Sequence, residues 1–159
     1  MNDPIPIDSV RDTMKGLGTA ELVRSNRIRV STAPEMIRKA VGVMMDSLGC
    51  NRLITISTAD NGTTLELIYH LTGPHCTIIS LATELPRNTP EIASVSDILL
   101  PAGIYERQIH DLFGIFFRGH PDLKRIILNE DWPADEFPLR KDWKKSPDTF
   151  YGGIKEERI

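Results

Sequence analysis

Two short turns between three alternating segments constrain the fold of this chain more than any other feature. Asn61-Gly62 joins segments 53–58 and 64–71, and Gly73-Pro74 separates the second of these from segment 76–81. Asn-Gly is a strong signal for a two-residue hairpin loop, because Asn and Gly accept the positive φ angles that such a loop needs. Strands joined by turns this short pair antiparallel. The sequence therefore predicts a three-stranded antiparallel meander.

The meander has one apolar face, and the segment before it has the pattern of a helix that can cover this face. The face is formed by alternate residues of the middle strand: Leu65, Leu67, Tyr69 and Leu71. Residues 32–35, Thr-Ala-Pro-Glu, have the pattern of a capping box at a helix start, with Pro in the first turn. The helix then places apolar residues at intervals of three and four and ends at Gly49: Met36, Ile37, Ala40, Val41, Met44 and Leu48.

The remaining elements of the predicted domain are shorter. A helix is expected over residues 8–16 with Asp8 as its N-cap, followed by a hairpin over 21–30. Three prolines make segment 86–101 mostly loop, with a short helical turn near residues 91–94. A second main helix covers 104–113, where Gly114 can end it. The sequence thus predicts an α+β domain over residues 1–128: a small, mostly antiparallel sheet with helices packed on one face.

Residues 129–159 break this pattern and predict an extended C-terminal tail. Pro133, Pro138 and Pro147 exclude regular helices and central strands. The tail is nevertheless too aromatic for an ordinary solvated segment: it carries Trp132, Phe137, Trp143, Phe150 and Tyr151. Segments that cannot fold alone but carry large apolar anchors often wrap a partner, so the tail is predicted to bind one, with Arg140 as its best-suited cation.

Composition excludes several classes of protein. The net charge is −3 and no basic stripe is present, which argues against a nucleic-acid partner. No apolar run approaches the roughly 20 residues that span a bilayer, and the N-terminus has no secretory-signal pattern. Cys50 and Cys76 are expected to be reduced thiols. Two thiols cannot hold an iron–sulfur cluster, and no Gly-rich nucleotide loop is present, so no cofactor is expected.

Two groups of side chains could carry chemistry. His70, His75 and Cys76 lack a fourth zinc ligand, and ordinary strand and turn roles are favoured. His110 and Asp111 could do acid–base work, but no nucleophile or third triad member accompanies them. The favoured interpretation is structural. In this interpretation, Glu106, Arg107 and Asp111 form charge-assisted hydrogen bonds that fix the second main helix against the loop that follows it. Residues 120–122 of that loop are expected to form a turn.

Segment 106–124 resembles the signature of the C subunit, the 30 kDa-type chain, of complex I and of the related membrane-bound energy-converting hydrogenases. The matching residues are Glu106, Arg107, Asp111, Leu112, Phe113, His120 and Lys124. Gln108 departs from the pattern, because the family usually has a second Glu there. Segment 137–143 resembles the family's HPLRKD segment and contributes Phe137, Arg140, Asp142 and Trp143, with Trp132 shortly before it. These signature and interface residues are the site that the resemblance predicts.

The resemblance implies a subunit of the peripheral arm, on the cytoplasmic side of the membrane, that carries no cofactor. Its expected partners are the large subunit, of the 49 kDa or NiFe-hydrogenase type, and the iron–sulfur subunits. His110 before Asp111 resembles the hydrogenase branch, whereas complex I chains more often have Trp there. The complex would be an ion-translocating hydrogenase or a complex I-like dehydrogenase. Two alternatives remain: a free-standing adaptor that binds through its aromatic tail, or a small acid–base enzyme using His110 and Asp111.

Overall fold

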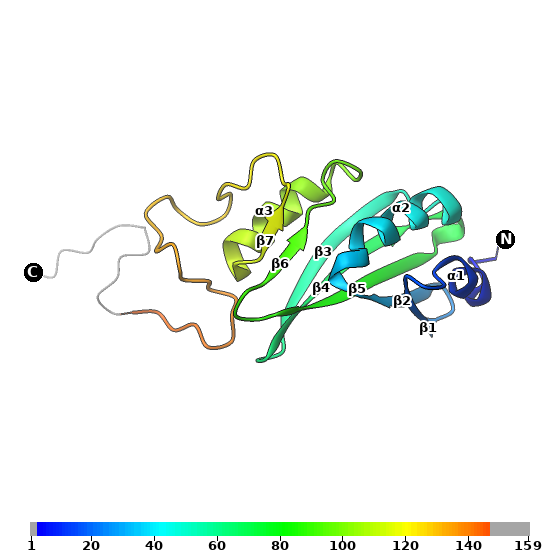
Figure 1. The fold of residues 1–159 in the computed structure, drawn as a ribbon, viewed down its shortest axis with the longest axis horizontal. Coiled ribbons are helices and arrows are strands. Elements are labelled where there is room, and N and C mark those ends of the chain that lie inside the picture. The colour runs from blue at the N-terminus through cyan, green and yellow to red at the C-terminus, as the bar shows by residue number, and fades with distance from the viewer. Residues whose placement is uncertain (1–2, 147–159) are drawn as a thin grey trace, which may run out of the picture.

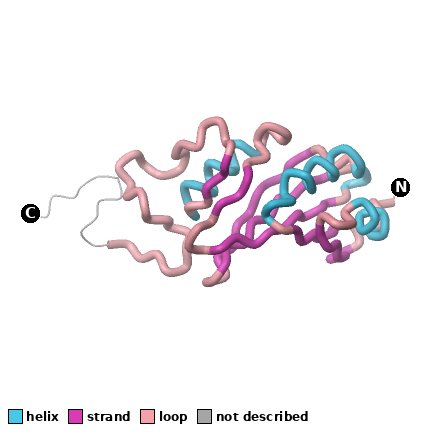
Figure 2. Tube along the Cα trace, viewed as in Figure 1, coloured by secondary structure: helices cyan, strands magenta, loops and turns pink. Residues whose placement is uncertain are grey.

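A computed structural model describes residues 3–146 (Figure 1), so Phe150 and Tyr151 lie outside the described residues. Helices and strands make up most of the chain as far as residue 118, and loops and turns follow (Figure 2). The helices are α1 (Ile7–Thr13), α2 (Ile37–Leu48) and α3 (Ala102–Phe113), with 3-10 turns at Pro34–Met36 and Pro74–Cys76. The strands are β1 (Gly18–Arg24), β2 (Arg27–Thr32), β3 (Arg52–Asp60), β4 (Thr64–Thr72), β5 (Ile78–Pro86), β6 (Glu91–Ala93) and β7 (Phe116–Arg118). Over residues 3–146, no helix is long and apolar enough to cross a membrane.

The main sheet has five strands in the order β1-β2-β5-β4-β3. The predicted antiparallel meander β3-β4-β5 and the hairpin β1-β2 are both confirmed. The hairpin joins the meander through a parallel pair, β2 with β5, so the sheet is mixed although three of its four pairs are antiparallel. Local alternation predicts strands but not this pairing, because β2 and β5 are separated by a helix and two strands.

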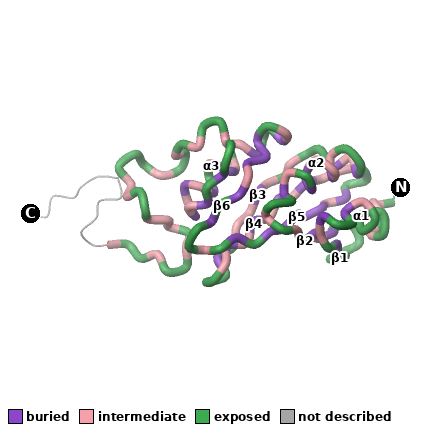
Figure 3. Tube along the Cα trace, viewed as in Figure 1, coloured by how far each residue is buried: buried purple, intermediate pink, exposed green. Residues whose placement is uncertain are grey.

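The core lies between one face of the sheet and the helices (Figure 3). The four alternate β4 side chains predicted for this face, residues 65, 67, 69 and 71, are all fully buried, and the residues between them are half-buried. The predicted apolar stripe of α2 is likewise buried from Ile37 to Leu48, but Met36 lies before the helix and is exposed. Helix α3 packs beside β3. The predicted α+β class, with helices on one face of a small sheet, is therefore confirmed.

Three local predictions are wrong. Asp8 does not cap α1, which begins at Ile7 after Pro6 and has no side-chain cap. The capping box does not form, because the Thr32 hydroxyl donates to the Leu17 carbonyl at 2.6 Å and ties the end of β2 to the chain before β1. The expected helical turn near residues 91–94 is strand β6, which pairs in parallel with β7. This pairing joins segments 25 residues apart, so no local pattern reveals it.

The two thiols differ in their surroundings, which gives a first testable prediction. Cys50 is fully buried, and burial raises the pKa of its thiol to about 11, whereas Cys76 is exposed in a turn. Since the thiolate is the reactive form, a thiol-alkylating reagent at pH 8 is expected to label one cysteine of the folded chain and both in denaturant. Mass spectrometry of Cys76→Ser checks this: rapid labelling of the folded variant would contradict the prediction.

Candidate functional site

The signature helix α3 holds a segment of chain along its length. We call residues 120–128 the strap. At the start of α3, His120 Nε2 donates to the Gly103 carbonyl at 3.0 Å, while His120 Nδ1 accepts from the Asp122 amide at 3.1 Å. One turn further on, Arg107 donates to two strap carbonyls. Near the end of α3, Asp111 accepts from strap amides. Three side chains of the signature thus hold the strap along the helix: His120 from the strap, and Arg107 and Asp111 from α3.

Asp111 makes the densest of these contacts. One carboxylate oxygen, Oδ2, accepts from the amides of Ile126, Ile127 and Leu128 at 3.1, 2.8 and 2.8 Å. The other oxygen lies 4.0 Å from Nε of Arg125, and the Asp111 side chain is 1% exposed. Hydrogen bonds from several amides to a carboxylate are charge-assisted and therefore strong. Asp111 thus fixes the backbone of the strap, and its carboxylate is occupied by its own chain.

Arg107 acts on the preceding part of the strap. Its guanidinium donates to the carbonyls of Lys124 and Arg125, both at 3.0 Å. It also lies 4.0 Å from the carboxylate of Asp122, which pairs with Lys124 at 3.0 Å. The Lys124 and Asp122 side chains are largely exposed, so their ion pair is worth little, while the carbonyl contacts of Arg107 fix the backbone.

Glu106, the first residue of the signature, points the other way, into the protein. It is fully buried and accepts from the Ser94 hydroxyl at 2.5 Å and the Val95 amide at 2.9 Å. Burial raises the pKa of Glu106, and these two hydrogen bonds offset only part of that effect. The contacts hold α3 to the segment after β6, so Glu106 braces the inner side of the helix as Asp111 braces its outer side.

The raised pKa of Glu106 predicts a pH-dependent stability difference. As pH rises from the ordinary value of 4.5 to the raised pKa, the unfolded chain loses this proton while the folded chain keeps it. The free energy of unfolding therefore falls with rising pH across this window. Glu106→Gln carries no titrating group, so its unfolding free energy minus that of the wild type should increase through the same window.

Urea unfolding of both proteins between pH 4 and 7 measures this difference. Asp60, Asp97, Asp122 and Asp142 have lowered pKa values and give the opposite slope, but they are common to both proteins and cancel. A difference that does not change with pH would refute the assignment of the buried proton to Glu106.

The geometry does not support His110 and Asp111 as an acid–base pair. Nδ1 of His110 donates to the Ile115 carbonyl at 2.9 Å, which holds the end of α3. Asp111 is occupied by amides of the strap, which also buries its side chain. Each residue is thus held by backbone groups of its own chain.

The described part of the tail is bound to the end of α3. The amide of Leu139 donates to the Leu112 carbonyl at 3.2 Å, and Nε of Arg140 donates to the Phe113 carbonyl at 2.8 Å. The Arg140 guanidinium also lies over the Phe137 ring, 4.6 Å from its centroid. That ring packs against Gly114, where a Cβ would come within 2.4 Å of it. Phe137 and Arg140, predicted as partner anchors, therefore anchor the tail to its own domain.

Asp142 joins the tail to the β3-β4 hairpin through a cluster that the sequence does not reveal. Arg87 pairs with both Asp142 and Asp60. Asp60 also accepts from the amides of Gly62, at 2.8 Å, and Lys141, at 2.9 Å. Burial alone would raise the pKa of Asp60, but these amides and Arg87 together lower it. No sequence motif marks Asp60 or Arg87, because their partners are distant in the chain.

The two tryptophans form a second contact within the tail. Trp132 and Trp143 stack with ring centroids 5.8 Å apart, and both indoles donate to Glu136 at 2.9 Å. Arg125 of the strap donates to the carbonyls of Trp132 and Pro133. All ten predicted site residues thus lie on α3, the strap or the tail. Of these, Glu106 is turned toward the segment after β6, where it contacts Ser94 and Val95.

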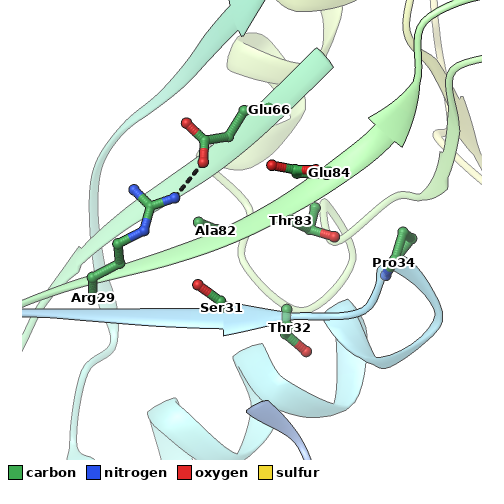
Figure 4. Close-up of a pocket in the computed structure, with 8 residues that line it drawn as sticks. All are labelled: Arg29, Ser31, Thr32, Pro34, Glu66, Ala82, Thr83 and Glu84. Carbon is green, nitrogen blue, oxygen red and sulfur yellow. Dashed lines mark hydrogen bonds and ion pairs between the residues drawn. The ribbon is translucent and has the colours of Figure 1, made fainter. Parts of the chain in front are cut away.

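A pocket of about 260 Å³ lies elsewhere, where β2, β4 and β5 meet (Figure 4). None of the signature side chains lines it: the lining residues are Arg29, Ser31, Thr32, Pro34, Glu66, Ala82, Thr83 and Glu84. Arg29 and Glu66 form an ion pair across the sheet, which occupies the only guanidinium of the lining. Within residues 3–146, no group of three or more His, Cys, Asp or Glu side chains could hold a metal ion.

Comparison with known proteins connects this arrangement to a family. A family model described as the 30 kDa subunit of the respiratory-chain NADH dehydrogenase matches residues 30–149. The C subunit of the F(420)H(2) dehydrogenase of Methanosarcina mazei is 36% identical over 124 residues, which cover 76% of this chain and 78% of that one. The C/D subunit of the NADH-quinone oxidoreductase of Phocaeicola vulgatus is 38% identical over 114 residues. That match covers 70% of this chain but only 21% of the relative.

Solved structures agree with the fold. A chain of the membrane-bound sulfane sulfur reductase, an archaeal respiratory membrane complex, superposes with a TM-score of 0.76 at 25% identity, covering 86% of this chain and 84% of that one. A trypsin-resistant fragment of Nqo5 superposes with a TM-score of 0.62 at 23% identity, covering 72% and 96%. From the extent of the family match and the relatives that share it, the chain belongs to the family of the 30 kDa subunit of the respiratory-chain NADH dehydrogenase.

Proposed function

We propose that this chain is a non-catalytic, peripheral subunit of a membrane-bound, ion-translocating oxidoreductase of the complex I or energy-converting hydrogenase type. In this role it docks on the large subunit and on the iron–sulfur subunits, on the cytoplasmic side. The observation that carries the proposal is that the signature charges bind backbone groups of their own chain, as Arg107 and Asp111 do. Through these contacts the signature side chains hold the strap on α3 and shape the surface there.

The partner follows from the relatives. The match to a C/D subunit of an NADH-quinone oxidoreductase means that a segment like this one is continuous with a D-type polypeptide in a single chain. Another relative, from Chloroherpeton thalassium, is named as a C subunit alone. Since the same segment occurs both fused and separate, its separate form is expected to bind the D-type large subunit that the fused form carries covalently.

The branch of the family stays a proposal with two candidates. One relative belongs to an F(420)H(2) dehydrogenase, and a chain of the sulfane sulfur reductase shares the fold. His110 before Asp111 favours the hydrogenase-like branch. The genes beside this one distinguish the candidates: a large subunit with two C-x-x-C pairs indicates a hydrogenase, and one without them indicates the complex I type. A free-standing adaptor is the alternative, although much of the tail that it would use is bound to α3.

Affinity purification tests the proposal in the native host. A tagged copy of the whole chain, recovered from gently solubilised membranes, should co-purify with a D-type large subunit and iron–sulfur subunits in equimolar amounts. Recovery of the chain alone, or with proteins that include no oxidoreductase subunit, would overturn the proposal.

A further inference from the structure

We infer that the outer side of α3, together with the middle of the strap, is the surface that binds the large subunit. This inference rests on the proposed function and assigns to it a place on the molecule. Its residues are Ile104 on α3, Ile126 and Ile127 on the strap, and Ile54, Leu100 and Leu139 on segments beside α3. We call these six residues the α3 surface. Each is a large apolar side chain that is at least two-fifths exposed.

The distribution of exposed apolar side chains supports this surface. Ten large apolar residues are exposed in the part of the chain that the structure describes, and six of them belong to the α3 surface. Single exposed apolar side chains are ordinary, but several of them on one helix and on the segments bound to it mark an interaction site. The remaining ones lie in other elements: Leu22 and Val23 in β1, Met36 before α2, and Phe116 in β7.

Hydrogen bonds to α3 bring these residues together from distant parts of the chain. Ile126 and Ile127 are held by Asp111, and Arg107 fixes the strap just before them. Ile104 lies on the same side of the helix as Arg107 and Asp111, because residues three, four and seven apart share a helix face.

Two further contacts extend the surface at its sides. The Tyr105 hydroxyl donates to the Ile54 carbonyl at 3.1 Å, and the Leu139 amide donates to the Leu112 carbonyl. The charged side chains of the signature therefore fix the backbone of the strap, while the isoleucines of the strap stay exposed. An exposed strap of this kind would be costly to order without a partner to cover it.

The place of the described tail supports the large subunit as the occupant. Residues 130–146 lie at the end of the molecule where α3 lies, opposite α1 and β1 (Figure 1). In the relatives whose name joins C and D, the D part follows the C part, as the name orders them. A large subunit continuous with this tail would lie nearer to α3 than to β1, whose exposed Leu22 is at the opposite end of the molecule.

Photo-crosslinking in the assembled complex tests the surface. In the native host, Ile127 of the tagged whole chain is replaced by p-benzoylphenylalanine. The same replacement at Leu22 is the matched control, because the exposed fraction of Leu22, 54%, is close to that of Ile127, 55%. After irradiation of membranes, position 127 is expected to give a crosslinked product with the large subunit. The yield of this product at position 22 should be roughly tenfold less, or lower still, because a side chain outside an interface meets no partner. Position 104 provides a second reporter in case substitution at 127 prevents assembly.

The outcomes separate this inference from the proposed function. A product between position 127 and a different subunit overturns the assignment of the large subunit, while the function stands. Assembly without crosslinks at 127 and 104, or with equal yield at position 22, overturns the surface. Failure of the tagged wild-type chain to recover any oxidoreductase subunit overturns the proposed function itself.

Discussion

Gly114→Ala is expected to detach residues 137–140 from the end of α3 and to lower the free energy of unfolding by about 3 kcal/mol, the sum of two causes. Gly114 has φ +73°, where a non-glycine residue costs roughly 1–2 kcal/mol. The new Cβ would also lie 2.4–2.7 Å from three Phe137 ring atoms, and overpacking of this kind typically costs about 1–3 kcal/mol.

Gly119→Ala is the matched control for this substitution. Gly119 has φ +84°, but no atom lies within 4 Å of the position its Cβ would take. It should therefore show the backbone cost alone, and the difference between the two variants measures the packing of Phe137. Urea unfolding gives both values, and equal losses would mean that the tail does not pack on Gly114.

Asp111→Ala should have the second large effect, a loss of about 3 kcal/mol in the free energy of unfolding. The substitution removes the acceptor of three amides, of Ile126, Ile127 and Leu128, and an unsatisfied donor costs about 1–3 kcal/mol when it is buried. Part of this cost is recovered because water reaches the exposed strap. Hydrogen exchange of these three amides should accelerate in the variant.

Asp122→Ala provides the comparison, because Asp122 is a half-exposed carboxylate of the same strap that pairs with Lys124. An exposed ion pair of this kind contributes less than about 1 kcal/mol. If the two alanine variants lose the same stability, Asp111 does not hold the strap as described.

The sequence predicts those parts of the fold that local patterns determine. The meander follows from Asn61-Gly62 and alternation in β4, and α2 follows from its apolar stripe. The parallel pairs β2-β5 and β6-β7 join distant segments, so their partners cannot be read from neighbouring residues. The capping box failed for a related reason, since a distant carbonyl, that of Leu17, binds the Thr32 hydroxyl instead.

The site was predictable only in part. The resemblance identifies Glu106, Arg107 and Asp111, and their charges suggest hydrogen bonds to a nearby loop. Asp60 and Arg87 carry no such mark. Asp60 accepts from the amide of Lys141, 81 residues away in the chain, and Arg87 pairs with Asp142, 55 residues away. Asp60 and Arg87 take part in the site only because the fold brings these distant segments together.

The tail shows how an aromatic pattern can be ambiguous. Its aromatic residues predict anchors, but the pattern does not say whether they bind a partner or their own domain. Phe137 packs on Gly114, which the sequence marks only as a helix stop. The boundary between residues 128 and 129, and the binding of a partner by the tail, stay predictions. Removing residues after 129 would nevertheless also remove Arg140 from α3 and Lys141 from Asp60.

The turnover of the assembled complex carrying Asp111→Asn in this chain tests most directly whether the signature shapes a docking surface or takes part in chemistry. Asparagine keeps the shape of Asp111 but loses its charge-assisted hydrogen bonds to the strap. With the amount of complex quantified from its large subunit, we expect fewer complexes and unchanged turnover per complex, and the same for Arg107→Ala. A full complement of complexes that have lost their activity would contradict the account and assign Asp111 a direct chemical role.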